Sequence, residues 1–201
     1  MSKMLKRKKF LNVGGNSKDI SVPSQFDGWE HLLLDIDPAG NPDIVCDARE
    51  IKTLEPGQFH AVYCSHNLEH FYHHEVPKVL QGFRHVLRPN GFVMISVPDL
   101  GDVIRTMVER GLDLDDVLYT TAAGIPILVR DVFYGWGFRM ELDEHDYFAH
   151  KTGFTQNSLE SVLKQNGFKY VYIQNQPLNI VAVAFMRKPE GWARDMLGLA
   201  A

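Results

Sequence analysis

The sequence predicts an α/β fold with a mostly parallel, doubly wound sheet that ends in an antiparallel hairpin. Short apolar runs bounded by glycine or polar residues recur through the first half of the chain. Between two of these runs, residues 76–87 place apolar side chains at helical spacing, which is typical of a parallel strand–helix–strand unit. The final runs, 168–173 and 180–186, are joined by too few residues for a parallel crossover, so they predict an antiparallel hairpin.

Residues 59–99 form the stretch around which the other elements are arranged. The apolar run 60–64 predicts a buried strand, and the polar loop 65–67 follows it directly. After the predicted helix, residues 88–91 have the proline, asparagine and glycine of a turn, and 92–97 read as the next strand. Because ligands of open parallel sheets bind beyond the carboxyl ends of strands, the loop after residue 64 is the first place to expect chemistry.

Three short apolar runs precede this stretch, and each ends in residues suited to ligand contact. Glycine at a strand end lets a ligand approach the backbone, and a carboxylate there can bind hydroxyl groups. In a parallel sheet these ends share one edge. The first run, 9–13, is followed by Gly14-Gly15. The other two runs, 31–35 and 42–47, end in Asp35 and Asp47.

Asp35 lies roughly 20 residues after the glycines, the spacing at which a carboxylate meets a ribose diol. Asp37 is the alternative, and Asp35 is favoured because it ends the apolar run directly. The intervening residues 17–29 contain Pro23 and Gly28, so they predict at most a short helical turn. A pyrophosphate needs a glycine-rich turn and a full helix N-terminus, so a phosphate-bearing cofactor is disfavoured.

Residues 112–151 interrupt the regular pattern that follows a predicted helix over 100–110. They are rich in aromatic, glycine and acidic residues, and a long irregular segment after a core strand is often a functional cover. Plain packing against the sheet edge is the alternative. Thr155 is then a suitable N-cap for a helix that ends at Gly167.

Composition favours one globular domain spanning residues 1–201, with 112–151 as an insertion that covers the substrate. The 201 residues are 45% hydrophobic and 23% charged. The net charge of −4 argues against general nucleic-acid binding, and the basic run 6–9 is interpreted as a solvated lead-in to the first strand. No run approaches a membrane span and no apolar signal core precedes the first strand, so we expect a cytoplasmic protein without a membrane partner. Cys46 and Cys64 are expected to be buried free thiols.

Several of these segments together resemble the class I S-adenosylmethionine-dependent methyltransferases, specifically their type 11 group. The resemblance covers roughly residues 10–188. It is carried by the segments 59–70 (Phe-His-Ala-Val-Tyr-Cys-Ser-His-Asn-Leu-Glu-His), 87–91 (Leu-Arg-Pro-Asn-Gly) and 150–155 (His-Lys-Thr-Gly-Phe-Thr), and by the closing hairpin. It implies a Rossmann-like, seven-stranded fold and an enzyme that uses S-adenosylmethionine. The family's first motif, Asp/Asn-hydrophobic-Gly-x-Gly, stands here as residues 12–16, with Asn16 in place of the last glycine.

The resemblance also implies roles for individual residues in cofactor binding. Gly14 and Gly15 would lie against the methionine moiety, and Asp35 would bind the ribose. Asp47 would bind the adenine amino group, with the backbone N–H of Ala48 beside it. Ser65 and His66 would pass next to the methionine part and the sulfonium.

Methyl transfer from a sulfonium is an in-line displacement, so alignment and exclusion of water are the protein's main tasks. A hydroxyl acceptor also needs a base, and histidine titrates in the useful range. His66 is the first candidate, His150 the second and His145 the third, whereas His70 is expected to hold the loop. The spacing of His66 and His70 with two further histidines would permit a metal site on a helix, yet no cysteine or aspartate cluster joins them, so we expect no metal.

The predicted function is transfer of a methyl group from S-adenosylmethionine to an oxygen or nitrogen of a small, polar, sugar-like acceptor. Two alternatives stay open at this point. One is a non-catalytic S-adenosylmethionine-binding partner subunit, because the first motif is altered. The other is a nicotinamide-dependent oxidoreductase, which the missing pyrophosphate site disfavours. The sequence leaves the oligomeric state open, with a homodimer among the alternatives.

Overall fold

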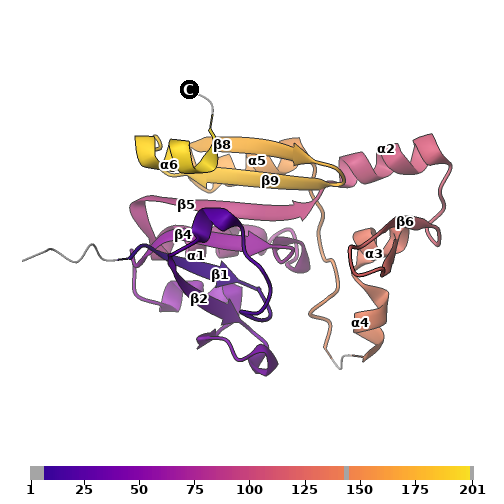
Figure 1. Cartoon of the computed structure of the whole chain (residues 1–201), viewed down its shortest axis with the longest axis horizontal. Helices are drawn as coiled ribbons and strands as arrows, with labels where there is room; N and C mark the ends of the chain where they lie inside the picture. The colour runs from indigo at the N-terminus through magenta and orange to yellow at the C-terminus, as the bar shows by residue number, and fades with distance from the viewer. Residues whose placement is uncertain (1–6, 143–144, 200–201) are drawn as a thin grey trace, which may run out of the picture.

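The computed structural model describes residues 7–142 and 145–199. Within these residues, one sheet has seven strands in the order β3-β2-β1-β4-β5-β9-β8, and a separate sheet pairs β6 with β7 (Figure 1). The first five strands of the large sheet run parallel, and β9 is antiparallel to both β5 and β8. The predicted α/β fold with an antiparallel C-terminal hairpin is therefore confirmed. The strands are β1 (Lys9–Val13), β2 (Glu30–Asp35), β3 (Ile44–Val45), β4 (Phe59–Ser65), β5 (Leu87–Pro98), β8 (Tyr170–Gln176) and β9 (Asn179–Phe185).

Several strand boundaries differ from the sequence prediction, those of β5 and β3 among them. Residues 88–91, predicted as a turn, lie inside β5. The β4–β5 pairing shifts register between Phe59 and Ala61, and the shifted end lets the exposed Arg88-Pro89-Asn90 segment stay extended. The third strand is only Ile44–Val45, shorter than the predicted run 42–47, because it pairs with β2 alone at the sheet edge.

One face of the sheet is covered by regular helices. They are α1 (Val76–Val86) and α5 (Gln156–Gln165), together with the 3-10 helix η3 (Ala48–Thr53). Their apolar side chains join those of the strands in the larger hydrophobic core. Burial of this apolar stripe explains why the helical spacing in the sequence predicted both α-helices.

The other face has no helix directly after β1. The chain makes only the 3-10 turn η1 (Ser24–Phe26), as predicted, and the C-terminal helix α6 (Gly191–Leu197) covers the rest of this face. Phe26 stacks on Phe10 with ring centroids 4.3 Å apart, and Trp29 meets Phe26 edge-on. Aromatic packing thus replaces the helix that a dinucleotide-binding unit would place here.

A third, smaller core lies to one side of the sheet (Figure 1). It is centred on Val103, Leu118, Val129 and Val132, all of them buried. We call residues 100–142 the side unit. It comprises α2 (Leu100–Arg110), β6 (Val117–Thr120), β7 (Pro126–Leu128), α3 (Val129–Tyr134) and α4 (Gly137–Leu142).

No helix within the described residues has both the length and the apolar character needed to cross a membrane.

Helix α5 provides a test of the predicted N-cap. Thr155 Oγ1 accepts a hydrogen bond from the backbone N–H of Ser158, and the Ser158 hydroxyl accepts one from the Thr155 N–H. Thr155→Ala is therefore expected to lower the free energy of unfolding by about 1 kcal/mol. Ser161→Ala, an exposed change within the same helix, should alter it by less than about 0.5 kcal/mol, because the gain in helix propensity is offset by loss of the hydrogen bond from Gln165. Urea unfolding of both variants and the wild type measures these differences. A free energy of unfolding of Thr155→Ala equal to that of the wild type would show that the cap contributes nothing.

Candidate active site

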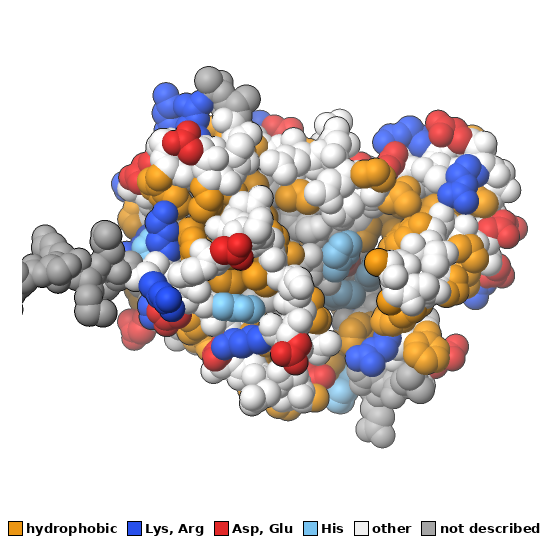
Figure 2. Space-filling model, viewed as in Figure 1, with side chains coloured by type: hydrophobic (Ala, Val, Ile, Leu, Met, Phe, Trp, Pro, Cys, Tyr) orange, Lys and Arg blue, Asp and Glu red, His pale blue; other side chains and the backbone are white. Residues whose placement is uncertain are grey.

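A cavity of about 400 Å³ lies at the carboxyl ends of β1, β2 and β4, where the sheet edge faces the segment that follows α4. Figure 2 shows pale blue histidine side chains in the hollow between the main body and the side unit on the right. The cavity brings the strand ends together with residues 146–151, which we call the cover. It is lined by Val13, Gly14, Asn16, Leu34, Asp35, Ile36, Asp37, Cys46, Asp47, Ala48, Arg49, His66, Asn67, His70, Phe71, Glu75, Trp136, Asp146, Tyr147, Phe148, His150 and Lys151.

The glycines after β1 allow the loop to lie close against its neighbours. Gly14 has a φ of +71° and donates its N–H to Leu34 O at 2.9 Å. A Cβ at Gly14 would overlap the side chain of Asn67, which lies across the loop. Gly15 does not line the cavity, and a Cβ there would overlap the side chain of Asn12. Glycine at both positions is therefore a steric requirement of the loop.

Asn16 takes the place of the third glycine in this motif and keeps a glycine-like backbone. Its φ is +59°, in the left-handed region that asparagine tolerates better than most residues. Its N–H donates to Asp35 Oδ2 at 2.8 Å. The substitution therefore preserves the path of the loop and ties it to the end of β2.

Asp35 is nearly buried, at 9% exposure, and its carboxylate lines the cavity. Oδ2 accepts from Asn16, and Oδ1 accepts from the N–H of Asp37 at 3.0 Å. Each oxygen keeps a second lone pair, so the carboxylate can still accept from two hydroxyl groups. Asp37 instead caps the 3-10 turn η2 (Pro38–Gly40) by accepting from Ala39 N at 2.8 Å. This difference favours Asp35 for the ribose role, which stays a prediction.

The end of β3 leads into an ion-pair network that the sequence analysis missed. Arg49 donates to Asp47 Oδ1 from its backbone N at 2.8 Å and from Nε at 3.0 Å, and to Oδ2 from Nη2 at 2.6 Å. Its Nη1 donates to Glu75 at 2.6 Å. Although burial raises the pKa of Asp47, the contacts with Arg49 hold it below its ordinary value.

The predicted contact of Asp47 with adenine therefore has a competitor. An adenine amino group has to share the carboxylate with Arg49 or displace one of its hydrogen bonds. Ala48, predicted to offer its N–H, lines the same part of the cavity and is buried. Both assignments remain predictions.

The end of β4 places an imidazole at the cavity on a strained backbone. His66 has a φ of +47°, and its N–H donates to Ser96 O at 2.8 Å. Its Nδ1 lies 3.4 Å from Glu69 Oε1. Burial alone would lower the pKa of His66, but the contact with Glu69 raises it above its ordinary value. Ser65, the last residue of β4, does not line the cavity, so any contact it makes with a cofactor stays a prediction.

His150 reaches the cavity from the cover, opposite the strand ends. Its Nδ1 lies 2.8 Å from Val132 O, and its ring centroid is 5.0 Å from that of His70. A carbonyl oxygen only accepts, so Nδ1 carries the proton and Nε2 has the free lone pair. Burial lowers the pKa of His150. The neutral imidazole is thus suited to accept a proton. His145, the third candidate, packs against Tyr147 and does not line the cavity.

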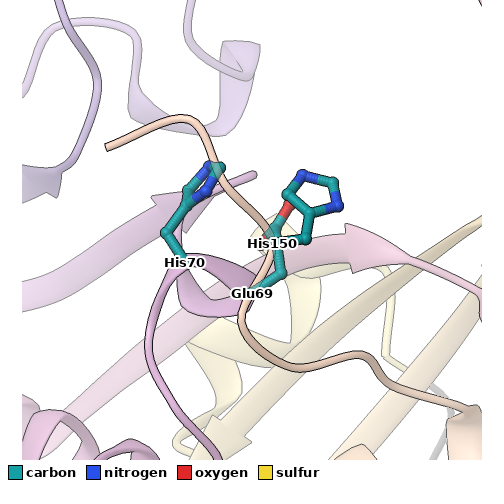
Figure 3. Close-up of side chains that lie close together, drawn as sticks. All are labelled: Glu69, His70 and His150. Atoms are coloured by element: carbon teal, nitrogen blue, oxygen red, sulfur yellow. The ribbon is translucent and has the colours of Figure 1, made fainter. Parts of the chain in front are cut away.

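Among the described residues, one group could hold a metal ion: Glu69, His70 and His150, whose ligand atoms lie within 4.8 Å of one another (Figure 3). However, His70 has carbonyl oxygens at both nitrogens, Ala149 O at 3.0 Å from Nδ1 and His66 O at 3.1 Å from Nε2. Both ring nitrogens of His70 therefore already lie at backbone oxygens, and a metal ion would have to displace one of these contacts. The expectation that no metal binds remains a prediction.

The far wall of the cavity comes from the side unit and from the segment that follows it. Trp136, Tyr147 and Phe148 line it, and Lys151 Nζ pairs with Asp146 at 2.9 Å. The predicted covering segment therefore faces the strand ends in this structure. Its role in covering a substrate stays a prediction.

The chain matches a family model described as "Methyltransferase domain" over residues 4–173. No curated protein matches it in sequence. The fold is shared with solved structures at low identity. An S-adenosylmethionine-dependent methyltransferase from Archaeoglobus fulgidus has 14% identity and a TM-score of 0.57, covering 89% of this chain and 86% of that one.

Two further solved structures have the same fold. The PH0226 protein from Pyrococcus horikoshii OT3 has 16% identity and a TM-score of 0.56, with 92% of this chain and 84% of that chain covered. The 1,6-didemethyltoxoflavin-N1-methyltransferase from Burkholderia thailandensis has 18% identity and a TM-score of 0.52, covering 92% of this chain and 72% of that one.

The narrower type 11 group stays a prediction, because the matched family is described only as a methyltransferase domain. The family match spans most of the chain, and the strand order and the closing antiparallel hairpin are those predicted for the class. The chain therefore belongs to the methyltransferase domain family, and its fold is that of the class I methyltransferases.

Proposed function

We propose that the protein transfers a methyl group from S-adenosylmethionine to an oxygen or nitrogen of a small, polar, sugar-like acceptor. One observation carries the proposal: a single cavity joins the glycine loop and the carboxylate of Asp35 on one side to two histidines, His66 and His150, on the other. Cofactor-binding groups and proton-accepting groups thus border the same space.

The residues around the cavity fit the cofactor. Gly14 lets the loop pack closely against Asn67, and both residues line the cavity, so a ligand there can contact the loop backbone. Asp35 retains lone pairs for the two ribose hydroxyls. Ala48 and Asp47 border the part of the cavity where we place the adenine, and His66 the part where we place the methionine moiety.

S-adenosylmethionine, when bound, supplies a methyl group on a sulfonium that is already reactive. The chain's own residues align the acceptor, exclude water and receive a proton where the acceptor is a hydroxyl. His150 is the better base of the two candidates, because its pKa is lowered and its Nδ1 proton is fixed on Val132 O. His66, with its pKa raised beside Glu69, is better suited to hold the loop and donate a hydrogen bond.

The wall formed by Trp136, Tyr147 and Phe148 supports this choice of acceptor class. Trp136, Tyr147 and Phe148 offer flat apolar surfaces, and the Lys151–Asp146 pair offers a donor and an acceptor beside them. Stacking surfaces next to a few polar groups suit a small polar ring such as a sugar.

Calorimetry with S-adenosylhomocysteine, S-adenosylmethionine and NAD tests the proposal. We expect 1:1 binding of the first two and none of NAD, followed by methyl transfer from labelled S-adenosylmethionine to acceptors in a panel of sugars and small hydroxylated or amino compounds. Binding of NAD alone would contradict the proposal. Binding without transfer to any acceptor would favour a non-catalytic subunit.

A further inference from the structure

Glu69 is a buried carboxylate that the proposed function does not use. Its side chain is 1% exposed, and neither carboxylate oxygen has a hydrogen-bond partner among the residues that the structure describes. Its backbone oxygen accepts from Lys151 N at 2.8 Å and Thr152 N at 3.1 Å, which joins the loop after β4 to the cover. A carboxylate removed from water without hydrogen bonds is unfavourable unless nearby cations compensate it.

Three imidazoles lie near this carboxylate, and Figure 3 shows two of them, His70 and His150. His66 Nδ1 lies 3.4 Å from Oε1, so a protonated His66 supplies a compensating charge. The ring nitrogens of His70 lie 3.0 Å from Ala149 O and 3.1 Å from His66 O, which holds this ring in place beside the carboxylate. His150 lies on the other side of Glu69, as the close-up shows, and its ligand atom is within 4.8 Å of the carboxylate.

We propose that Glu69 is a positioning residue for the reaction. Its carboxylate is the counter-ion of the imidazolium that forms when His150 takes a proton from a hydroxyl acceptor. The inference rests on the proposed function. In this step the acceptor O–H bond breaks and its proton binds His150 Nε2. The acceptor oxygen forms a bond to the methyl carbon, and the electron pair of the broken carbon–sulfur bond stays on sulfur. The resulting imidazolium is paired with Glu69 until its proton passes to solvent.

Other ionisable groups that face this cluster keep their own partners. From β4, the Cys64 thiol is fully buried, and burial raises its pKa so that it stays neutral. From the cover, Lys151 is paired with Asp146. Among the described residues, Glu69 is therefore the anion whose removal should change the titration of His66 and His150.

The test is an NMR titration of the histidine ring protons in the full chain saturated with S-adenosylhomocysteine. Glu69→Gln should lower the pKa of His150 by about 1, because the anion that stabilises its charged form is gone. The pKa of His66 should fall as well. Glu69→Asp keeps the charge and should show a smaller change. Glu75→Gln, which removes a carboxylate bound to Arg49 on the same cavity, should leave both values unchanged. His150→Gln assigns the resonance.

Calorimetry on the same samples separates this inference from the proposed function. Glu69→Gln should bind S-adenosylhomocysteine within about threefold of the wild type, because Glu69 does not border the cavity. An unchanged pKa of His150 in a folded Glu69→Gln chain would overturn the inference. If that variant does not fold, Glu69→Met removes the charge with a side chain of similar volume, and an unchanged value in it has the same meaning. Binding of Zn²⁺ or Mg²⁺ to the wild type but not to Glu69→Gln would overturn it in favour of a metal ligand. Failure of the wild type to bind S-adenosylhomocysteine counts against the proposed function instead.

Discussion

Asp35→Ala is expected to weaken binding of S-adenosylhomocysteine by about 100-fold, which corresponds to about 2.7 kcal/mol. A carboxylate that accepts from two ribose hydroxyls makes two charge-assisted hydrogen bonds, each worth about 1.5–3 kcal/mol. The change also removes the acceptor that holds the N–H groups of Asn16 and Asp37. Titration calorimetry measures the affinity directly.

Asp37→Ala is the matched control, because Asp37 lines the same cavity but caps its own 3-10 turn. It should change the affinity by less than about threefold, since no ribose contact is assigned to it. An Asp35→Ala protein that binds as tightly as the wild type would refute the ribose assignment. A large loss of affinity for S-adenosylhomocysteine in Asp37→Ala, without one in Asp35→Ala, would assign the ribose contact to Asp37.

Gly14→Ala should be the most damaging single change in the glycine loop. The alanine has to adopt a φ of +71° and place its Cβ in the side chain of Asn67. Backbone strain and overpacking together should lower the free energy of unfolding by about 2–4 kcal/mol. S-adenosylhomocysteine binding should fall as well, because the new methyl group occupies the cavity wall. Chemical unfolding and calorimetry measure the two effects.

Gly28→Ala separates strain from overlap. Gly28 has a similar φ of +76°, but nothing lies within 4 Å of its Cβ position. It should cost only about 1 kcal/mol and leave cofactor binding intact. Adding Asn67→Ala to Gly14→Ala should recover part of the lost stability. Equal destabilisation by Gly14→Ala and Gly28→Ala would show that the contact with Asn67 is unimportant.

Strand ends were predictable from the sequence because burial on both faces makes parallel strands short apolar runs. Asp35 and Asp47 each follow such a run, and the topology brings both to one cavity with Gly14. The same logic failed at 88–91, where a turn-like sequence stays extended at an exposed strand end. Turn residues tolerate more than one backbone conformation when no neighbour fixes them.

Other features depend on contacts between distant segments and could not be predicted from local pattern. The bond between Asn16 and Asp35 gives an apparently degraded motif its glycine-like conformation. The pairing of Arg49 with Glu75 joins the 3-10 helix η3 to the residue that precedes α1. The burial of Glu69 among histidines depends on the distant segment that carries His150.

The central claim is that the cavity beside Gly14 and Asp35 holds the methyl donor. A crystal structure of the full chain with S-adenosylhomocysteine tests it most directly. We predict that the ribose hydroxyls lie within hydrogen-bond distance of the Asp35 carboxylate and that the sulfur faces the space between His66 and His150. A ligand bound elsewhere, or a ribose that contacts neither Asp35 oxygen, would contradict the account.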